Sequence, residues 1–312
     1  MPSFLLHKVS KQSFFDGIKS LNVSTQDNYI SAINKFEKFS KQKYNHNSKE
    51  IVIELKSIKG EERDLAYFNL LQEFVNWLID CKLANSTVNM YAQIISYFFS
   101  YYGIRVHPID LRHNVKKPKK IKEKLHAITK EEIQKILRQS IEKRKMLYLT
   151  LIGTGMRIQE CVSLQKHHFD LSFPKRIKIE IPAQFTKART AHTTFVSKQA
   201  EFYLRTHLES LDDNSLIFAT NSNTIHAKMT EIEAFTRTRN KVGLIKKYSC
   251  TNRHHITLHS FRSYFFTRAR RIHDTDIAHA LVGHTTYLDM YDRKDDIEKL
   301  ELFLKIEPEL SI

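Results

Sequence analysis

The sequence has few of the residues that break helices, form disulfides or bind structural metals. Its 312 residues include only 7 Gly and 6 Pro, which favours a largely helical chain with few tight turns. Cys81, Cys161 and Cys250 are odd in number and form no CxxC pair, so they predict neither a disulfide framework nor a zinc site. No apolar run approaches the roughly 20 residues of a membrane span. We therefore expect a cytoplasmic protein.

Acidic residues are also fewer than basic residues. The chain has 50 Lys and Arg against 34 Asp and Glu, a formal net charge of +16. Such an excess repels itself in a compact protein unless an anionic partner is present. Nucleic acid is the commonest such partner, and an anionic membrane, the alternative, has no span or signal segment to support it here. The charge therefore predicts binding to nucleic acid.

The spacing of apolar residues divides the chain into three regions. In residues 1–111 the apolar residues, many of them aromatic, recur at helical spacing. This pattern predicts an all-α domain with the aromatic rings in its core. Ser24 is a candidate N-cap for one of these helices. Residues 112–124 have no apolar period and predict an interdomain linker. Residues 125–312 then form a second domain.

The basic segment at 112–124 has two interpretations. A run of lysines is usually a solvated face or a tail. Because this run stands between two periodic regions, a linker that crosses a phosphate backbone is the functional alternative. Its candidate DNA-binding residues are Lys116, Lys117, Lys119 and Lys120.

The second domain is predicted to be mixed α+β, mainly helical, with a small antiparallel sheet. Thr129 and Glu132 have the spacing of a capping box at the start of its first helix. The stretch RIKIEIPAQFT alternates apolar and polar residues from Ile177 to Phe185, which predicts a strand, and HTTFVS is its candidate hairpin partner.

The C-terminal stretch DDIEKLELFLKIEPELSI predicts a short amphipathic helix. Its candidate apolar residues are Ile297, Leu300, Leu302 and Phe303. The sequence leaves open whether this helix packs on its own domain or docks on a neighbouring protomer.

Polar side chains interrupt the apolar patterns of the second domain at several places. Arg157 follows a glycine break, Lys187 follows the predicted strand, and His284 follows Gly283. His259 and Arg262 lie one helical turn apart in the stretch LHSFRSYFFTRA. Taken singly, each has an ordinary explanation, such as a surface arginine or a hydrogen-bonded core histidine.

Taken together, these residues fit one chemistry. Two arginines can clamp the oxygens of a phosphate, and histidines can donate to it or transfer protons near neutral pH. A lysine can protonate a leaving oxygen, and Tyr287 or Tyr291, which would share one face of a helix, can attack phosphorus. No carboxylate cluster for magnesium and no GxxxxGK[ST] loop is present. The set predicts phosphoryl transfer without a metal or any other cofactor.

The ordered motifs resemble those of the tyrosine recombinases, or phage integrases. GTGMRIQECVSL is similar to the family's first arginine box, with Glu160 three residues after Arg157. FTKARTAHTTFVS resembles the hairpin that carries the family's catalytic lysine, HSFR its His-x-x-Arg, and LVGH its Leu-x-Gly-His. The N-terminal helices resemble the family's core-binding domain, and the form GHTTYLDMYDR resembles archaeal-type integrases.

The resemblance implies a site-specific recombinase that cleaves and rejoins double-stranded DNA through a 3′-phosphotyrosyl intermediate. It implies a monomer in solution, a homotetramer on DNA and association with the nucleoid. The site residues that it implies are Arg157, Lys187, His259, Arg262, His284 and Tyr291, with Glu160 in support.

Tyr291 is the preferred nucleophile, since its distance from His284 is nearer to the family's usual spacing, and Tyr287 is the second choice. Two other functions remain open. One is a type IB topoisomerase-like nicking and closing enzyme, and the other is a DNA-binding relative that has lost catalysis.

Overall fold

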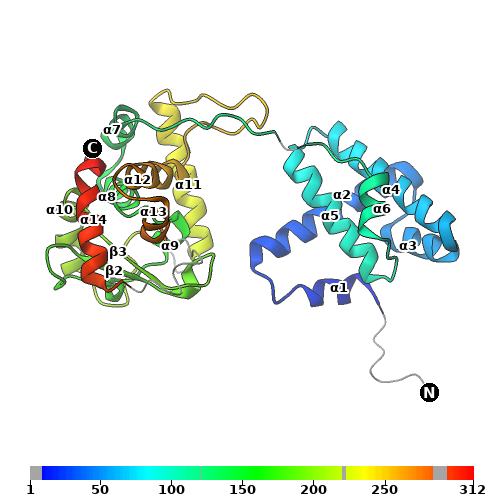
Figure 1. Ribbon diagram of the computed structural model, residues 1–312, viewed down its shortest axis with the longest axis horizontal. Helices are drawn as coiled ribbons and strands as arrows, with labels where there is room; N and C mark the ends of the chain where they lie inside the picture. The colour runs from blue at the N-terminus through cyan, green and yellow to red at the C-terminus, as the bar shows by residue number, and fades with distance from the viewer. Residues whose placement is uncertain (1–8, 120, 220–222, 284–293) are drawn as a thin grey trace, which may run out of the picture. The chain divides into compact units, whose positions relative to one another are not determined.

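Helices make up most of the described chain. The computed structural model describes residues 9–119, 121–219, 223–283 and 294–312, and it divides the chain into two compact units, residues 1–123 and 124–312 (Figure 1). No helix within these described ranges is long and apolar enough to cross a membrane.

The first unit is all-α in its described residues. Its helices are α1 (Lys11–Gly17), α2 (Val23–Tyr44), α3 (Ser48–Ser57), α4 (Gly60–Asp80), α5 (Asn85–Tyr101) and α6 (Pro108–Asn114). Aromatic rings from α2, α4 and α5 meet edge to face in its core, for example Phe36 with Phe74 and with Phe99. The prediction that these aromatic residues form a helical core is therefore confirmed.

One predicted cap was wrong. The N-cap of α2 is Asn22, whose side chain accepts a hydrogen bond from the backbone N–H of Thr25 at 2.9 Å. Ser24 lies inside the first turn instead. Asparagine at the position before the helix satisfies one of the free N–H groups of that turn, so the helix begins earlier than the serine suggests.

The basic segment begins as part of the first unit. Val115 is buried in that unit's core. The backbone of Lys116 exchanges two hydrogen bonds with the side chain of Gln72 on α4, and Asn85 on α5 donates to the carbonyl of Lys119 at 2.8 Å. The backbone is thus fixed on α4 and α5, while the side chains of Lys116 and Lys119 are exposed.

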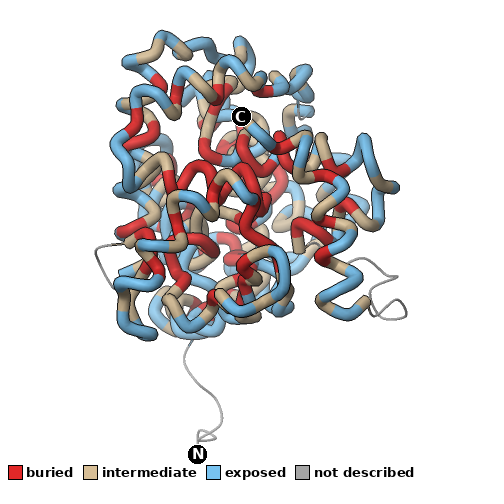
Figure 2. The backbone as a smooth tube through the Cα atoms, turned by 90° about the vertical axis from the view of Figure 1, so that its left-hand side faces the viewer, coloured by how far each residue is buried: buried red, intermediate tan, exposed pale blue. Residues whose placement is uncertain are grey.

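In its described residues the second unit combines helices with a three-stranded sheet. The helices are α7 (Lys130–Gln139), α8 (Glu142–Thr154), α9 (Ile158–Val162), α10 (Lys198–Glu209), α11 (Thr224–Lys241), α12 (His259–Ile272), α13 (Thr275–Leu281) and α14 (Asp296–Leu310). The antiparallel strands are β1 (Phe169–Asp170), β2 (Lys178–Ile181) and β3 (His192–Phe195), in the order β1-β2-β3, and short 3₁₀ turns occupy Lys166–His168 and Ala183–Phe185. Figure 2 shows the buried residues of this unit gathered at its centre. The predicted fold class is confirmed.

The predicted hairpin is present, with Ile179 opposite Thr194, but β2 is shorter than the alternation suggested. It ends at Ile181, because the next residue is a proline, which has no N–H for a strand ladder, and the chain continues as a 3₁₀ turn. The capping box at Thr129 and Glu132 is confirmed, with both reciprocal hydrogen bonds formed.

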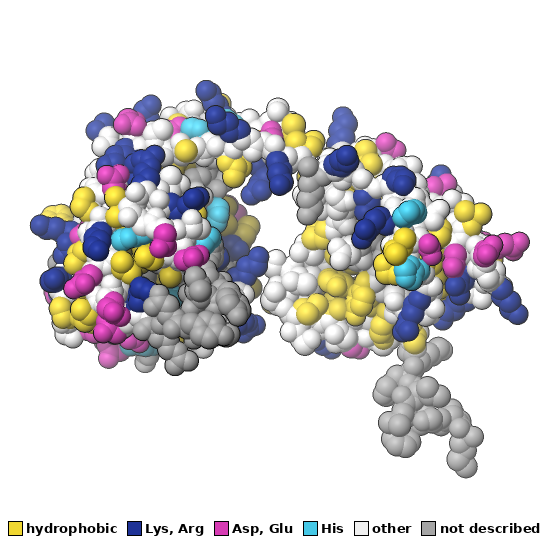
Figure 3. All heavy atoms as spheres, viewed as in Figure 1, with side chains coloured by type: hydrophobic (Ala, Val, Ile, Leu, Met, Phe, Trp, Pro, Cys, Tyr) yellow, Lys and Arg dark blue, Asp and Glu magenta, His cyan; other side chains and the backbone are white. Residues whose placement is uncertain are grey.

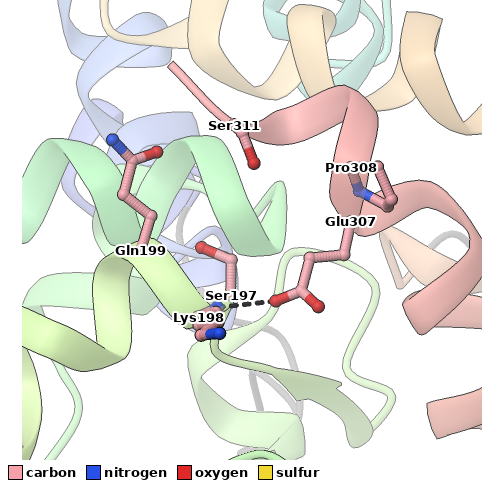
Figure 4. A pocket seen from close by; sticks show the side chains of 6 residues that line it. All are labelled: Ser197, Lys198, Gln199, Glu307, Pro308 and Ser311. Atoms are coloured by element: carbon pink, nitrogen blue, oxygen red, sulfur yellow. Dashed lines mark hydrogen bonds between the residues drawn. The ribbon is translucent and has the colours of Figure 1, made fainter.

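The C-terminal helix α14 packs on its own unit. Leu300, Phe303, Ile306 and Leu310 are buried, whereas Ile297, which the sequence placed on the apolar face, is 45% exposed. Polar contacts add to the packing. Glu307 accepts from the backbone N–H of Lys198 at 2.6 Å (Figure 4). It also accepts from the guanidinium of Arg176 at 2.6 and 2.8 Å. Of the two arrangements that the sequence left open, the structure has the intramolecular one.

Candidate active site

Arg157 stands at the N-terminus of α9, directly after a tight turn. Helix α8 ends at Thr154 and is followed by Gly155, whose φ of 66° is left-handed. A Cβ at this position would lie 2.6 Å from the ring of Phe265 on α12, so only glycine lets the chain pass so close. The turn therefore delivers Arg157 to the surface of α12.

Glu160 fixes the direction of Arg157. Its carboxylate is 1% exposed and accepts from both the backbone N–H and Nη1 of Arg157, each at 2.8 Å. A charged pair held at two points loses little further freedom when a ligand binds. The side chain of Arg157 remains 26% exposed, which leaves part of its guanidinium open to an anion.

Arg262 joins two turns of the chain. Its side chain on α12 is 4% exposed, Nη1 donates to the carbonyl of Gly155 at 2.7 Å, and Nη2 donates to the carbonyl of Val282 at 2.8 Å. These bonds use two of the five N–H donors of a guanidinium. Burial, reinforced by the charge of Arg157, lowers the pKa of Arg262 to about 10, so it stays a cation at neutral pH.

His259 lies one turn before Arg262, at the first position of α12. Partial desolvation, followed by the positive charges of Arg262 and Arg157, lowers its pKa below the usual value for histidine. The neutral imidazole is therefore favoured at neutral pH, a form that can accept as well as donate a proton. The structure thus gathers Arg157, Glu160, His259 and Arg262 around one end of α12.

Lys187 is placed differently. It lies in the turn between β2 and β3, which Thr186 closes by accepting from the backbone N–H of Thr190 at 3.0 Å. Its side chain is exposed. The structure therefore presents Lys187 on an exposed hairpin loop.

Three predicted site residues, His284, Tyr287 and Tyr291, lie outside the described residues, as does Lys120. The described chain reaches the cluster at Gly283 and resumes at Lys294.

The sequence did not indicate a role for two residues near the cluster. His192, the first residue of β3, lies against Gly283. Arg239 on α11 is 3% exposed and donates to the carbonyl of Ile256 in the segment that leads to His259. In the sequence, a polar residue opening the second strand of the hairpin was the only signal for His192, and Arg239 had none.

Basic side chains are widely distributed over the surface. Figure 3 shows Lys and Arg on the visible face of both units. Of the candidate DNA-binding lysines in the described chain, Lys116, Lys117 and Lys119 are exposed on the first unit.

Comparison with solved structures shows the same fold. A lambda integrase dimer bound to a COC′ core site is 15% identical, with a TM-score of 0.63, over 92% of this chain and 100% of that chain. The Tn1549 transposon integrase in complex with transposon right-end DNA is 15% identical, with a TM-score of 0.61, over 93% and 96% of the two chains. The XerH recombinase bound to its difH substrate is 21% identical, with a TM-score of 0.56, over 93% and 82%.

Comparison with curated proteins gives no match. The family model described as the phage integrase family, by contrast, matches residues 126–290, more than half of the 312 residues. The matched region contains the arginine turn, the β2–β3 hairpin and α12. The chain therefore belongs to the phage integrase family, that of the tyrosine recombinases.

Proposed function

We propose that the protein is a site-specific DNA recombinase that cleaves and rejoins double-stranded DNA through a 3′-phosphotyrosyl intermediate. The observation that supports this most is the arrangement of Arg157 and Arg262. One is held by a buried carboxylate, the other joins the two turns that flank the cluster, and both keep N–H donors that bind no other residue of the described chain. Because the chain belongs to the phage integrase family, we interpret this arrangement as a site for a DNA phosphate.

The two arginines bind the scissile phosphate. Their planar guanidinium groups match the non-bridging oxygens and stabilise the negative charge that grows in the transition state. Arg262 is well suited to this task because it is buried, where an electrostatic interaction is stronger than in water. Glu160 keeps Arg157 oriented and does not itself react.

The reaction breaks one bond and forms another. The hydroxyl oxygen of Tyr291 attacks phosphorus, the bond from phosphorus to the 5′-oxygen breaks, and the DNA is left with a 3′-phosphotyrosyl link and a free 5′-hydroxyl. His259, neutral at rest, accepts the tyrosine's proton. Lys187 protonates the leaving 5′-oxygen, and His284 donates a hydrogen bond to the phosphoryl group. The covalent link conserves the bond energy, so a second 5′-hydroxyl reverses the step without ATP.

Assembly on DNA follows by analogy. Lambda integrase has been seen as a dimer on a core site and as a tetramer bound to a Holliday junction. We propose that this protein is a monomer in solution and a homotetramer on two DNA sites, and that it associates with the nucleoid. Residues 1–111 act as the core-binding domain and residues 125–312 as the catalytic domain. In the linker, 112–124, lysines 116, 117, 119 and 120 bind backbone phosphates.

Covalent capture tests this function even though the target sequence is not known. The protein is incubated with a pool of nicked duplexes of random sequence, in which the fragment released by cleavage diffuses away and traps the adduct. We expect adducts that survive denaturation. One duplex sequence should predominate among them, and we call this duplex the selected nicked duplex. If no adduct forms, the protein is a DNA-binding relative without catalysis.

Strand exchange separates the recombinase from a topoisomerase-like enzyme. Two differently labelled duplexes that carry the selected sequence should yield recombinant strands. Relaxation of a supercoiled plasmid with no exchange would instead assign the protein to nicking and closing.

A further inference from the structure

His192 occupies the space where a side chain at position 283 would lie. An ideal Cβ built on Gly283 would be 2.4 Å from both Cε1 and Nε2 of the imidazole and 2.6 Å from Cδ2. The Nε2 edge of the ring therefore abuts the backbone of Gly283. Because Gly283 also has a left-handed φ of 65°, both the conformation and the contact require glycine here.

Two neighbours bear on the ring of His192. The backbone of Thr190 lies close enough to raise its pKa, although Nδ1, which is buried, forms no hydrogen bond of normal geometry with a described residue. The second neighbour is Gly283, against which the ring is packed.

The ring is electrically neutral at neutral pH. Burial lowers the pKa of His192, and the charges of Arg262 and Arg157 lower it further, while the charge of Glu160 and the backbone of Thr190 oppose them. A neutral amide side chain is therefore a fair substitute for this imidazole.

The turn Val282–Gly283 is held from two sides. Nη2 of Arg262 binds the carbonyl of Val282 at 2.8 Å from the side of α12, and His192 meets Gly283 from the start of β3. The next residue along the chain is His284. A shift of the turn would therefore displace the start of the segment that carries the proposed nucleophile.

We propose that His192 is a positioning residue of the recombination reaction, which holds the Val282–Gly283 turn against α12 and so sets where the chain after it begins. This inference rests on the proposed function. It adds a contact from the lysine-bearing hairpin to the turn that Arg262 already binds. His192 acts through that turn and takes no part in the bond changes.

Two amide variants provide a matched test. In His192→Gln the amide reaches about as far as Nε2 and keeps the contact with Gly283, whereas in His192→Asn it stops near the position of Nδ1. We expect single-turnover adduct formation on the selected nicked duplex to be close to wild type for Gln and slower by about 10-fold or more for Asn. A displacement of about 1 Å can cost on the order of 10²-fold in rate. Duplex affinity and Tm should match in the two variants.

Equal rates for the two variants, or a loss of Tm and DNA affinity in His192→Asn that parallels the loss of rate, would overturn the proposal. A double-mutant cycle in Tm tests the contact itself. Gly283→Ala should lower Tm more in the wild type than in His192→Asn, because the shorter side chain leaves room for the new methyl group. Equal losses of Tm would show that the two residues do not press on one another.

Failure of the proposed function has a different signature. The wild-type protein would then form no adduct with any duplex of the pool, while the Tm cycle at positions 192 and 283 would still give its result.

Discussion

The two units of the protein bury very different polar groups. In the described part of the first unit, the buried polar residues are Ser40 and Ser48, and the core is otherwise made of aliphatic and aromatic side chains. The described part of the second unit buries three charged side chains, those of Glu160, Arg239 and Arg262. Burying a charge is costly unless it is paired and hydrogen-bonded, so a unit that only has to fold avoids it.

The buried charges of the second unit lie where phosphate chemistry is proposed. Glu160 and Arg262 belong to the cluster at the end of α12, and Arg239 supports the segment that precedes that helix. The cost of their desolvation is thus concentrated around one site. We infer that the first unit is stabilised mainly by packing, whereas part of the second unit's stability is given up for a preorganised anion site.

Removing α14 should have the largest effect on stability. We expect that effect to be confined to the second unit. Truncation after Arg293 deletes Phe303 and Ile306 from the core, together with the bonds of Glu307. We expect the second unit to lose its cooperative thermal transition. Phe303→Ala, a milder change, should cost about 3–5 kcal/mol in the free energy of unfolding. A truncated protein with an unchanged thermal profile would show that this helix is not part of the core.

Variants of the two buried arginines separate an effect on stability from an effect on the chemical step. Arg262→Ala should slow adduct formation on the selected nicked duplex by about 10²–10³, the usual effect of losing one placed electrostatic donor. It should also lower Tm, because two carbonyls lose their partner. Arg239→Ala is the matched control and should lower Tm comparably with a much smaller loss of rate. Equal rate losses would mean that burial, and not phosphate binding, explains both.

Substitution of one carboxylate in each unit allows a direct comparison of the two units. Glu160→Gln weakens the hold on Arg157 and should slow adduct formation by about 10-fold, since hydrogen bonds to charged groups are worth about 1.5–3 kcal/mol. Glu37→Gln disturbs a similar arrangement in the first unit, where the carboxylate accepts from Ser48 and Lys11. It should change Tm and leave the chemical step intact. A slower chemical step in Glu37→Gln would contradict the division of roles between the units.

The smallest effect is expected for the exposed lysines. Replacing Lys116, Lys117 and Lys119 by Gln should flatten the dependence of log affinity on log salt by up to roughly 0.9 for each phosphate that the variant no longer neutralises. The control variant carries the same change in net charge at three other exposed lysines of the first unit, Lys38, Lys49 and Lys59. If both variants flatten the slope equally, the segment after α6 has no special part in DNA binding.

The sequence predicted those features that depend on neighbours in the chain. The helical core of the first unit, the capping box at Thr129 and the hairpin that joins β2 to β3 all follow from local spacing. Strand β1 was missed because its two residues, Phe169 and Asp170, are too short for any alternation to appear. The prediction of Ser24 as the N-cap failed because serine and asparagine are equally good caps and the sequence alone does not show that the helix begins after Asn22.

The candidate site was predictable in its residue types but not in its connections. The motifs pointed to Arg157, His259 and Arg262, and the structure brings these three together. That Arg262 ties the carbonyls of Gly155 and Val282 together could not be inferred, because these bonds span 107 and 20 residues of chain. The contact of His192 with Gly283 could not be inferred for the same reason.

The most direct test of the proposed chemistry is to map the covalent adduct. The wild-type protein is trapped on the selected nicked duplex and digested, and the peptide that carries the nucleotide is sequenced. We predict a single phosphotyrosine at Tyr291, joined to the 3′-phosphate of the cleaved strand. We expect no adduct in Tyr291→Phe, and adduct formation about 10²–10³ slower in Arg262→Ala. Attachment at Tyr287 would change the nucleophile and leave the reaction unchanged. An adduct on the 5′ side of the break, or one that forms at the wild-type rate without Arg262, would contradict the central claim that Arg157 and Arg262 hold a phosphate for attack by a tyrosine.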